Sequence, residues 1–133
     1  MTEKNIHNAR VLIMDDEEII CKVLIKILTK EGYRADSARN GETAIKMYQQ
    51  SVDEGDTFDL IIMDMTIKGG MGAVDAVKGI LAINPDAKVA VSSGYSDDPV
   101  MKNFEDYGFK GVITKPYTFE QILHSITEIL NRS

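Results

Sequence analysis

The stretch FDLIIMDMTIKGGMG, residues 58–72, gives the strongest indication of the fold. An unbroken apolar run ends in a carboxylate, Asp64, and a glycine-rich segment follows at once. A short continuous apolar run bounded by turn residues is typical of a strand that is covered on both faces, as in a parallel sheet. The pattern therefore predicts a central strand with an acidic side chain at its carboxyl end.

The whole chain alternates between short apolar runs and amphipathic stretches. Five segments are predicted as strands: RVLIMD (10–15), YRADSA (33–38), DLIIMD (59–64), KVAVSS (88–93) and GVITK (111–115). Apolar residues at helical spacing and cap signals predict a helix after each strand. These helices are expected over 17–31, 41–50, 73–83, 99–107 and 118–130.

This alternation indicates a parallel sheet with right-handed crossovers. We expect an α/β fold of the flavodoxin-like type, a (βα)5 chain with a doubly wound, five-stranded parallel sheet in the order 2-1-3-4-5. A length of 133 residues suits one domain, so residues 1–133 are predicted to form a single domain with its core over about 9–131. In such sheets ligands bind beyond the carboxyl ends of the strands.

Composition excludes several classes of partner. The formal net charge of −6 argues against binding a nucleic-acid backbone, which requires clustered cations. The single cysteine, Cys21, allows no internal disulfide and suits a reducing cytoplasm. The polar N-terminus does not resemble a signal peptide, and no apolar run approaches the roughly 20 residues that a membrane span needs. We therefore expect a cytoplasmic protein with no direct nucleic-acid or membrane partner.

Polar side chains follow four of the predicted strands. Asp15 and Asp16 follow the first, Asp64 ends the third, Ser92 lies at the end of the fourth, and Lys115 ends the fifth. A parallel sheet brings these ends to one edge, so we expect the five side chains to share one site. Three carboxylates in one pocket repel each other unless a cation neutralises them. Mg²⁺ suits such a site, because it prefers oxygen ligands and takes only a few protein carboxylates.

The same residues suit phosphoryl transfer to a carboxylate, with Asp64 as the nucleophile. Asp16 and Asp64 are predicted as direct metal ligands, Asp15 as a ligand either directly or through water, and a backbone carbonyl just after Asp64 as a further contact. The metal and Lys115 would offset negative charge on the phosphoryl oxygens. Ser92 would donate a hydrogen bond to one of these oxygens.

Each of these features also has a plain structural interpretation. Asp15 and Asp16 would suit the start of a helix, and an aspartate after a strand is common in turns. Ser-Ser-Gly and Lys-Pro are ordinary loop sequences. The functional interpretation depends on their occurrence together, at four strand ends of one predicted edge.

In combination these motifs resemble the receiver domain of two-component response regulators, the CheY-like family. The resemblance covers about residues 9–131 and is carried by VLIMDDEE (11–18), LIIMDMTIKGGMG (60–72), VAVSSG (89–94) and VITKPY (112–117). Within the family, GGMG, SSGYSDDPVM and YGFKGVITKPY look most like receivers attached to hybrid sensor histidine kinases.

The resemblance implies a role for each site residue. Asp64 is identified with the phosphoacceptor, and Asp15 and Asp16 with the acidic pocket that binds Mg²⁺, or Mn²⁺ in its place. By the same resemblance the backbone carbonyl of Thr66 is a third metal contact, Ser92 is the switch hydroxyl and Lys115 is the phosphate partner. It further implies a cis peptide bond before Pro116.

The resemblance also implies a signalling function. The phosphoryl group would come from a phosphohistidine on a sensor histidine kinase or a histidine phosphotransfer protein, and the output would be a partner protein or an output domain outside this chain. The domain would be no enzyme beyond slow self-catalysed phosphorylation and dephosphorylation. Two alternatives stay open, a Mg²⁺-dependent phosphohydrolase on the same fold and a phosphorylation-independent protein-binding module.

Two positions depart from the family pattern. Lys68 stands four residues after Asp64, where the family often has proline. Val112 stands three residues before Lys115, where the family often has an aromatic residue that moves with the switch hydroxyl. The second departure predicts that any change at the output surface proceeds by loop and helix movement rather than by an aromatic rotamer change.

Overall fold

The computed structural model describes residues 8–95 and 97–132 and confirms the predicted sheet. Five parallel strands lie in the order β2-β1-β3-β4-β5. They are β1 (Arg10–Met14), β2 (Arg34–Ala38), β3 (Leu60–Asp64), β4 (Val89–Ser93) and β5 (Gly111–Thr114). The first seven residues, part of the polar N-terminus in which no signal peptide was found, lie outside the described residues.

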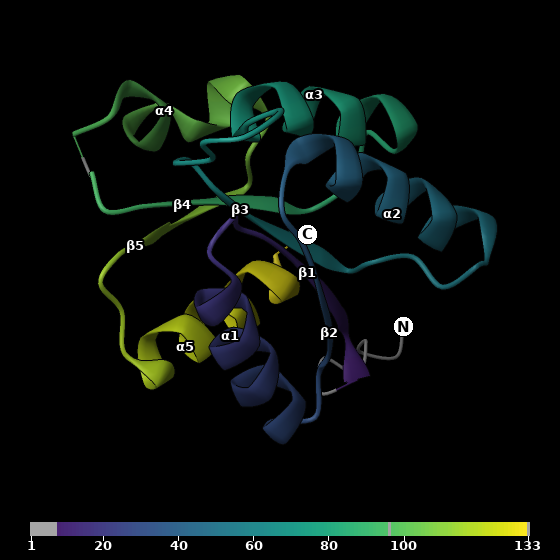
Figure 1. Ribbon diagram of the computed structural model, residues 1–133, viewed down its shortest axis with the longest axis horizontal. Coiled ribbons are helices and arrows are strands. Elements are labelled where there is room, and N and C mark those ends of the chain that lie inside the picture. The colour runs from purple at the N-terminus through teal and green to yellow at the C-terminus, as the bar shows by residue number, and fades with distance from the viewer. Residues whose placement is uncertain (1–7, 96, 133) are drawn as a thin grey trace.

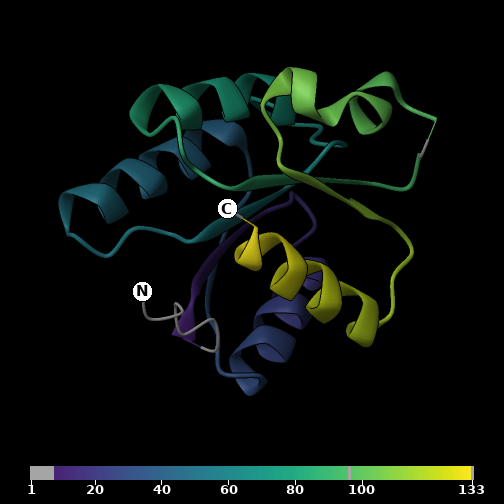
Figure 2. The same ribbon diagram turned by 180° about the vertical axis from the view of Figure 1, so that it is seen from behind.

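Helices cover both faces of the sheet, as the doubly wound prediction requires. They are α1 (Glu18–Lys30), α2 (Gly41–Asp53), α3 (Ala73–Ile83), α4 (Pro99–Lys102) and α5 (Phe119–Asn131), with a 3-10 helix, η2 (Phe104–Tyr107), after α4. Figure 1 shows α2, α3 and α4 over one face and α1 and α5 over the other, and Figure 2 shows the same layers from behind.

The burial of the strands explains the unbroken apolar run before Asp64. All five residues of β3 are buried, and so are all five of β4. Alternate residues of a strand face opposite sides of a sheet. Met63 accordingly packs in the core beneath α2 and α3, whereas its neighbour Ile62 packs in the core beneath α1 and α5. A strand with a core on each side has to be apolar throughout, and only its end is free for a polar residue.

The helix boundaries differ from prediction in one important place. The prediction of one continuous helix over 99–107 is wrong, because the backbone of Asn103 leaves the helical region (φ −117°, ψ 38°) and separates α4 from η2. The Asn103 side-chain amide donates a hydrogen bond to the Pro99 carbonyl at 3.1 Å. Asparagine often competes in this way with regular helical bonding.

The predicted cap residues are confirmed at two helices. The side chain of Asp98 accepts a hydrogen bond from the Val100 amide at 2.9 Å, and Thr118 with Gln121 forms the reciprocal capping box of α5. Within residues 8–95 and 97–132, none of the helices combines the length and the apolar character that crossing a membrane requires.

Candidate functional site

The register of the sheet brings the predicted site residues to one edge. Met14 of β1 lies opposite Met63 of β3. Asp15 and Asp64, which directly follow these two residues, therefore lie side by side. Asp64 in turn lies opposite Ser92 of β4. This arrangement depends on the register of three strands that are distant in sequence.

Three carboxylates form the centre of the site. Asp15, Asp16 and Asp64 each place one oxygen so that the three oxygens lie within 4.8 Å of one another. The side chains of Asp15 and Asp64 are only 4% and 5% exposed, whereas Asp16 is partly exposed. Oxygen atoms this close match the hard, all-oxygen ligand set that Mg²⁺ takes.

Each member of the acidic pair also organises the backbone around it. Oδ1 of Asp15 accepts a hydrogen bond from the Glu17 amide at 2.9 Å, at the start of α1. Oδ2 of Asp16 accepts one from the Lys68 amide at 3.0 Å, in the connection between β3 and α3. Asp15 thus fixes the residue that precedes α1, but Glu17 is the N-cap and no side chain caps this helix, so the helix-start interpretation does not account for Asp15.

Lys115 reaches into the site from the end of β5. Its Nζ lies 3.4 Å from Oδ2 of Asp15 and 3.4 Å from Oδ1 of Asp64, so one ammonium group bridges two buried carboxylates. Because Asp16 is also present, three carboxylates face one ammonium group. The site therefore has an excess of negative charge that a divalent cation would balance.

The pKa shifts of Asp64 and Lys115 reflect burial and the charges around them. Burial raises the pKa of Asp64 above its usual value and the charge of Asp15 adds to the rise, while Lys115 and the Thr66 backbone amide oppose it. Burial alone would lower the pKa of Lys115, but the charges of Asp64 and Asp15 outweigh it and raise this pKa. Ionisation of Asp64 is thus less favourable in the folded protein than in water, although a cation is next to it.

The two serines that end β4 differ in their partners. The Ser93 hydroxyl accepts a hydrogen bond from the Tyr95 amide at 3.0 Å. The Ser92 hydroxyl is buried and has no hydrogen-bond partner among the described residues. Buried hydroxyls without a partner are uncommon, and each requires an explanation. Ser92, which is next to Asp64 in the sheet, therefore has a hydroxyl available for a ligand.

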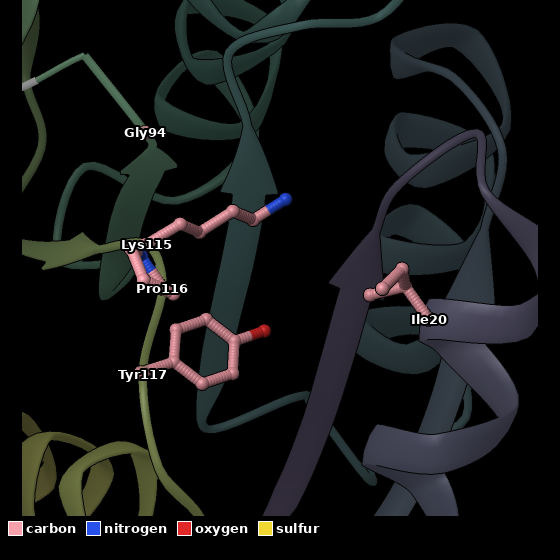
Figure 3. Close-up of a pocket in the computed structure, with 5 residues that line it drawn as sticks. All are labelled: Ile20, Gly94, Lys115, Pro116 and Tyr117. Atoms are coloured by element: carbon pink, nitrogen blue, oxygen red, sulfur yellow. The ribbon is translucent and has the colours of Figure 1, made fainter.

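A pocket of about 480 Å³ lies beside these residues and is lined mainly by apolar groups. Figure 3 shows Lys115, Pro116 and Tyr117 on one side of it and Ile20 of α1 on the other, with Gly94 at its rim. The peptide bond between Lys115 and Pro116 is cis, as predicted. Burial raises the pKa of the Tyr117 phenol. Sequence reasoning had assigned no role in this site to Tyr117 or Ile20.

Comparison with known proteins agrees with the fold. The model of the response regulator receiver domain family matches residues 11–127. The chain belongs to the response regulator receiver family. Receivers of this family are signalling modules rather than classical enzymes, and they work with histidine kinases and output partners. They bind Mg²⁺ at an acidic pocket, and Asp15, Asp16 and Asp64 form a cluster of that kind here.

Two similar proteins are chemotaxis proteins, and the match covers most of the length of each. The receiver is 31% identical to the chemotaxis protein CheY of Thermotoga maritima over 121 residues, which is 90% of this chain and 96% of the relative. It is 33% identical to CheY of Treponema pallidum over 122 residues, covering 91% of this chain and 82% of the relative. The likeness to receivers of hybrid kinases stays a prediction.

One solved structure is informative because of what it contains. A chain of the CheX–CheY–BeF3–Mg²⁺ complex from Borrelia burgdorferi superimposes on the receiver with a TM-score of 0.83 and 26% identity, covering 93% of this chain and 90% of that chain. The likeness extends over nearly the whole of both chains.

The two departures from the family pattern are both accommodated by the fold. The Lys68 side chain is exposed, and it is the backbone amide of this residue that contacts the site, through Asp16. Val112 is partly buried and packs against the core on the side of α3 and α4. The smaller residue thus takes part in ordinary packing at the position where the family often has an aromatic ring.

Proposed function

We propose that residues 1–133 form a single receiver domain that accepts a phosphoryl group on Asp64. The donor is a phosphohistidine on a sensor histidine kinase or a histidine phosphotransfer protein. The observation that supports this most strongly is the meeting of three carboxylates within 4.8 Å of each other, with Lys115 at 3.4 Å from two of them. These four residues come from three strand ends, those of β1, β3 and β5.

The donor set fits Mg²⁺, with Mn²⁺ as a substitute. Asp15, Asp16 and Asp64 would hold the ion together with the backbone carbonyl of Thr66, because hard cations of this size take oxygen ligands. When bound, the ion supplies positive charge that stabilises the phosphoryl oxygens during transfer. The Borrelia burgdorferi complex, one chain of which is similar to this receiver, contains both Mg²⁺ and BeF3. Its content is consistent with a metal beside a phosphoryl site.

The residues of the chain then have separate roles in the transfer. A carboxylate oxygen of Asp64 attacks phosphorus, the phosphorus–nitrogen bond of the donor breaks, and its electron pair stays on the imidazole nitrogen. The Lys115 ammonium lies where it can neutralise a phosphoryl oxygen, and the Ser92 hydroxyl donates a hydrogen bond to another. The same groups support slow phosphorylation by small donors and slow hydrolysis, without turnover of a separate substrate.

Phosphorylation would act on the output through Ser92. Phosphorylation replaces the single charge of the Asp64 carboxylate with up to two charges on phosphoryl oxygens that also accept hydrogen bonds. The Ser92 hydroxyl at the end of β4, which has no hydrogen-bond partner among the described residues, is placed to respond. The response would reach α4, β5 and α5 by movement of the β4–α4 connection, because Val112 carries no ring to rotate. The output is a cytoplasmic partner protein, or an output domain outside this chain.

The test is phosphorylation by acetyl phosphate in the presence of Mg²⁺, followed by intact mass spectrometry. We expect the wild-type protein to gain one phosphoryl group and Asp64→Asn to gain none. Asp75→Asn, which changes an exposed carboxylate at the start of α3, is the matched control and should be labelled like the wild type. Equal labelling of Asp64→Asn would refute the assignment of the acceptor.

Two further measurements address the alternatives. Continued turnover of a generic phosphomonoester would indicate a phosphohydrolase. Unchanged amide NMR shifts in α4 and β5 on addition of beryllofluoride with Mg²⁺ would indicate a phosphorylation-independent binding module.

A further inference from the structure

The connection between β3 and α3, residues 65–72, follows Asp64 directly and is held at two points by carboxylates. Near its start, the Lys68 amide donates to Oδ2 of Asp16 at 3.0 Å. Near its end, the Met71 amide donates to Oε1 of Glu42 at 2.5 Å. Asp16 is one of the proposed metal ligands. Glu42 belongs to the first turn of α2 and is not one of these ligands.

The start of α2 lies tightly against the same connection. The Gly41 amide donates to the Met71 carbonyl at 2.7 Å, so both backbone groups of Met71 are bound by neighbouring residues of one helix. A Cβ on Gly41 would lie 2.8 Å from Cγ of Met71 and 2.9 Å from its carbonyl oxygen, so only glycine permits this approach. Asn40 caps the helix, with its side chain accepting from the Thr43 amide at 2.9 Å.

A connection this rich in glycine needs hydrogen bonds to neighbouring elements if it is to keep one conformation. It contains three glycines, and glycine loses more conformational freedom on ordering than any other residue. Gly70 takes a left-handed conformation (φ 94°) beside Glu42 and Asn40. A hydrogen bond to a carboxylate is stronger than one to a neutral acceptor, and the helix dipole favours a negative charge at the first turn of α2.

We propose that Glu42 is a positioning residue for the phosphorylation site. By holding the Met71 amide, it orders the connection that carries Thr66 and Lys68, and so presents the Thr66 carbonyl to the metal in a fixed place. Binding is tighter when the ligand groups are ordered in advance, because less entropy is lost on binding. The inference rests on the proposed metal site and adds to it a residue from α2.

The proposal predicts a loss of metal affinity from a substitution outside the ligand set. Glu42→Ala should weaken Mg²⁺ binding about three- to tenfold, the range that follows from losing one ordering hydrogen bond. Glu42→Gln keeps an acceptor oxygen and should restore most of the affinity. Thr43→Ala, an exposed neighbour on the same helix turn, is the matched control and should bind like the wild type.

The experiment combines Mg²⁺ titration with hydrogen exchange of the metal-free proteins. We expect faster exchange of the Met71 and Lys68 amides in Glu42→Ala, weaker Mg²⁺ binding, and a thermal midpoint close to that of the wild type. If Glu42→Ala lowers the thermal midpoint but leaves Mg²⁺ affinity and Met71 exchange unchanged, Glu42 only supports the helix and the proposal is wrong. Wild-type protein that binds no Mg²⁺ would overturn the metal site and this inference together.

Discussion

Aspartates cluster at both ends of the strands, but the cations that neutralise their charge differ between the amino-terminal edge and the carboxyl-terminal edge of the sheet. At the amino-terminal edge, Arg10 and Arg34 face a group of carboxylates. Arg34 forms a bidentate pair with Asp56 at 2.8 and 3.0 Å, and Arg10 contacts Asp56 and Asp36 at 3.7 and 3.5 Å. Arg10 also stacks on Phe58, with 4.1 Å between its Cζ and the ring centroid.

At the carboxyl-terminal edge, the Lys115 ammonium contacts two almost fully buried carboxylates, and a third carboxylate, Asp16, lies beside them. The pKa shifts of Asp56 and Asp64 point in opposite directions. The hydrogen bond from Arg34 lowers the pKa of Asp56, whereas burial raises the pKa of Asp64. The first edge is a set of structural ion pairs, and the second has an unbalanced charge that suits it for binding a cation.

The largest expected effect is on metal binding. Asp16→Asn should weaken Mg²⁺ affinity by at least about 100-fold. Losing a residue that only supports a metal ligand typically weakens affinity by about 10- to 100-fold, and losing the ligand itself should cost more. Asp36→Asn, at the opposite edge, should leave the affinity unchanged. Isothermal titration of both variants tests the comparison, and equal losses in the two would show that the edges do not differ in the way described.

A smaller effect is expected on stability without metal. Asp64→Asn should raise the free energy of unfolding at neutral pH by on the order of 1 kcal/mol, the usual size of a single-substitution effect. The variant removes a buried charge, and Lys115 keeps Asp15 as a partner. Chemical denaturation in the presence of a chelator measures this difference. Added Mg²⁺ should stabilise the wild type by mass action more than the variant.

The pH dependence of that difference follows from the sign of the shift. The pKa of folded Asp64 lies above its unfolded value, so ionisation destabilises the folded state. The penalty is absent in acid, where both states are protonated, and it develops as the pH rises from the unfolded pKa to the folded pKa. A stabilisation by Asp64→Asn that persists below the unfolded pKa would contradict this explanation.

The smallest expected effect lies at the amino-terminal edge and has the opposite sign. Asp56→Asn should slightly destabilise the protein at neutral pH, by less than Asp64→Asn stabilises it, because exposed ion pairs contribute little. The lowered pKa of Asp56 means that its contribution is present above the unfolded pKa and is lost as the pH falls through the folded pKa. Thermal melts from neutral to acid pH measure it. In an Arg34→Gln background the effect of Asp56→Asn should largely disappear.

Much of the fold could be predicted because its signals are local. The apolar runs and the cap residues Asp98 and Thr118 depend on spacing within a few residues, and the structure agrees with them. The break at Asn103 was missed because it depends on the conformation of one backbone position. Glu42 was missed because no motif marks it, and its hydrogen-bond partner, Met71, lies 29 residues away.

The site likewise combines features that local sequence signals predict with features that depend on contacts between distant residues. The sequence by itself placed Asp15, Asp64 and Lys115 at the ends of strands, and parallel topology then required those ends to share an edge. The tertiary structure was needed to show that, among the described residues, the Ser92 hydroxyl has no hydrogen-bond partner whereas the Ser93 hydroxyl has one, and that one lysine reaches both buried carboxylates. The reason is physical: periodicity along the chain determines which residues form an element, but strand register and side-chain contacts are set by packing between segments that are distant in sequence.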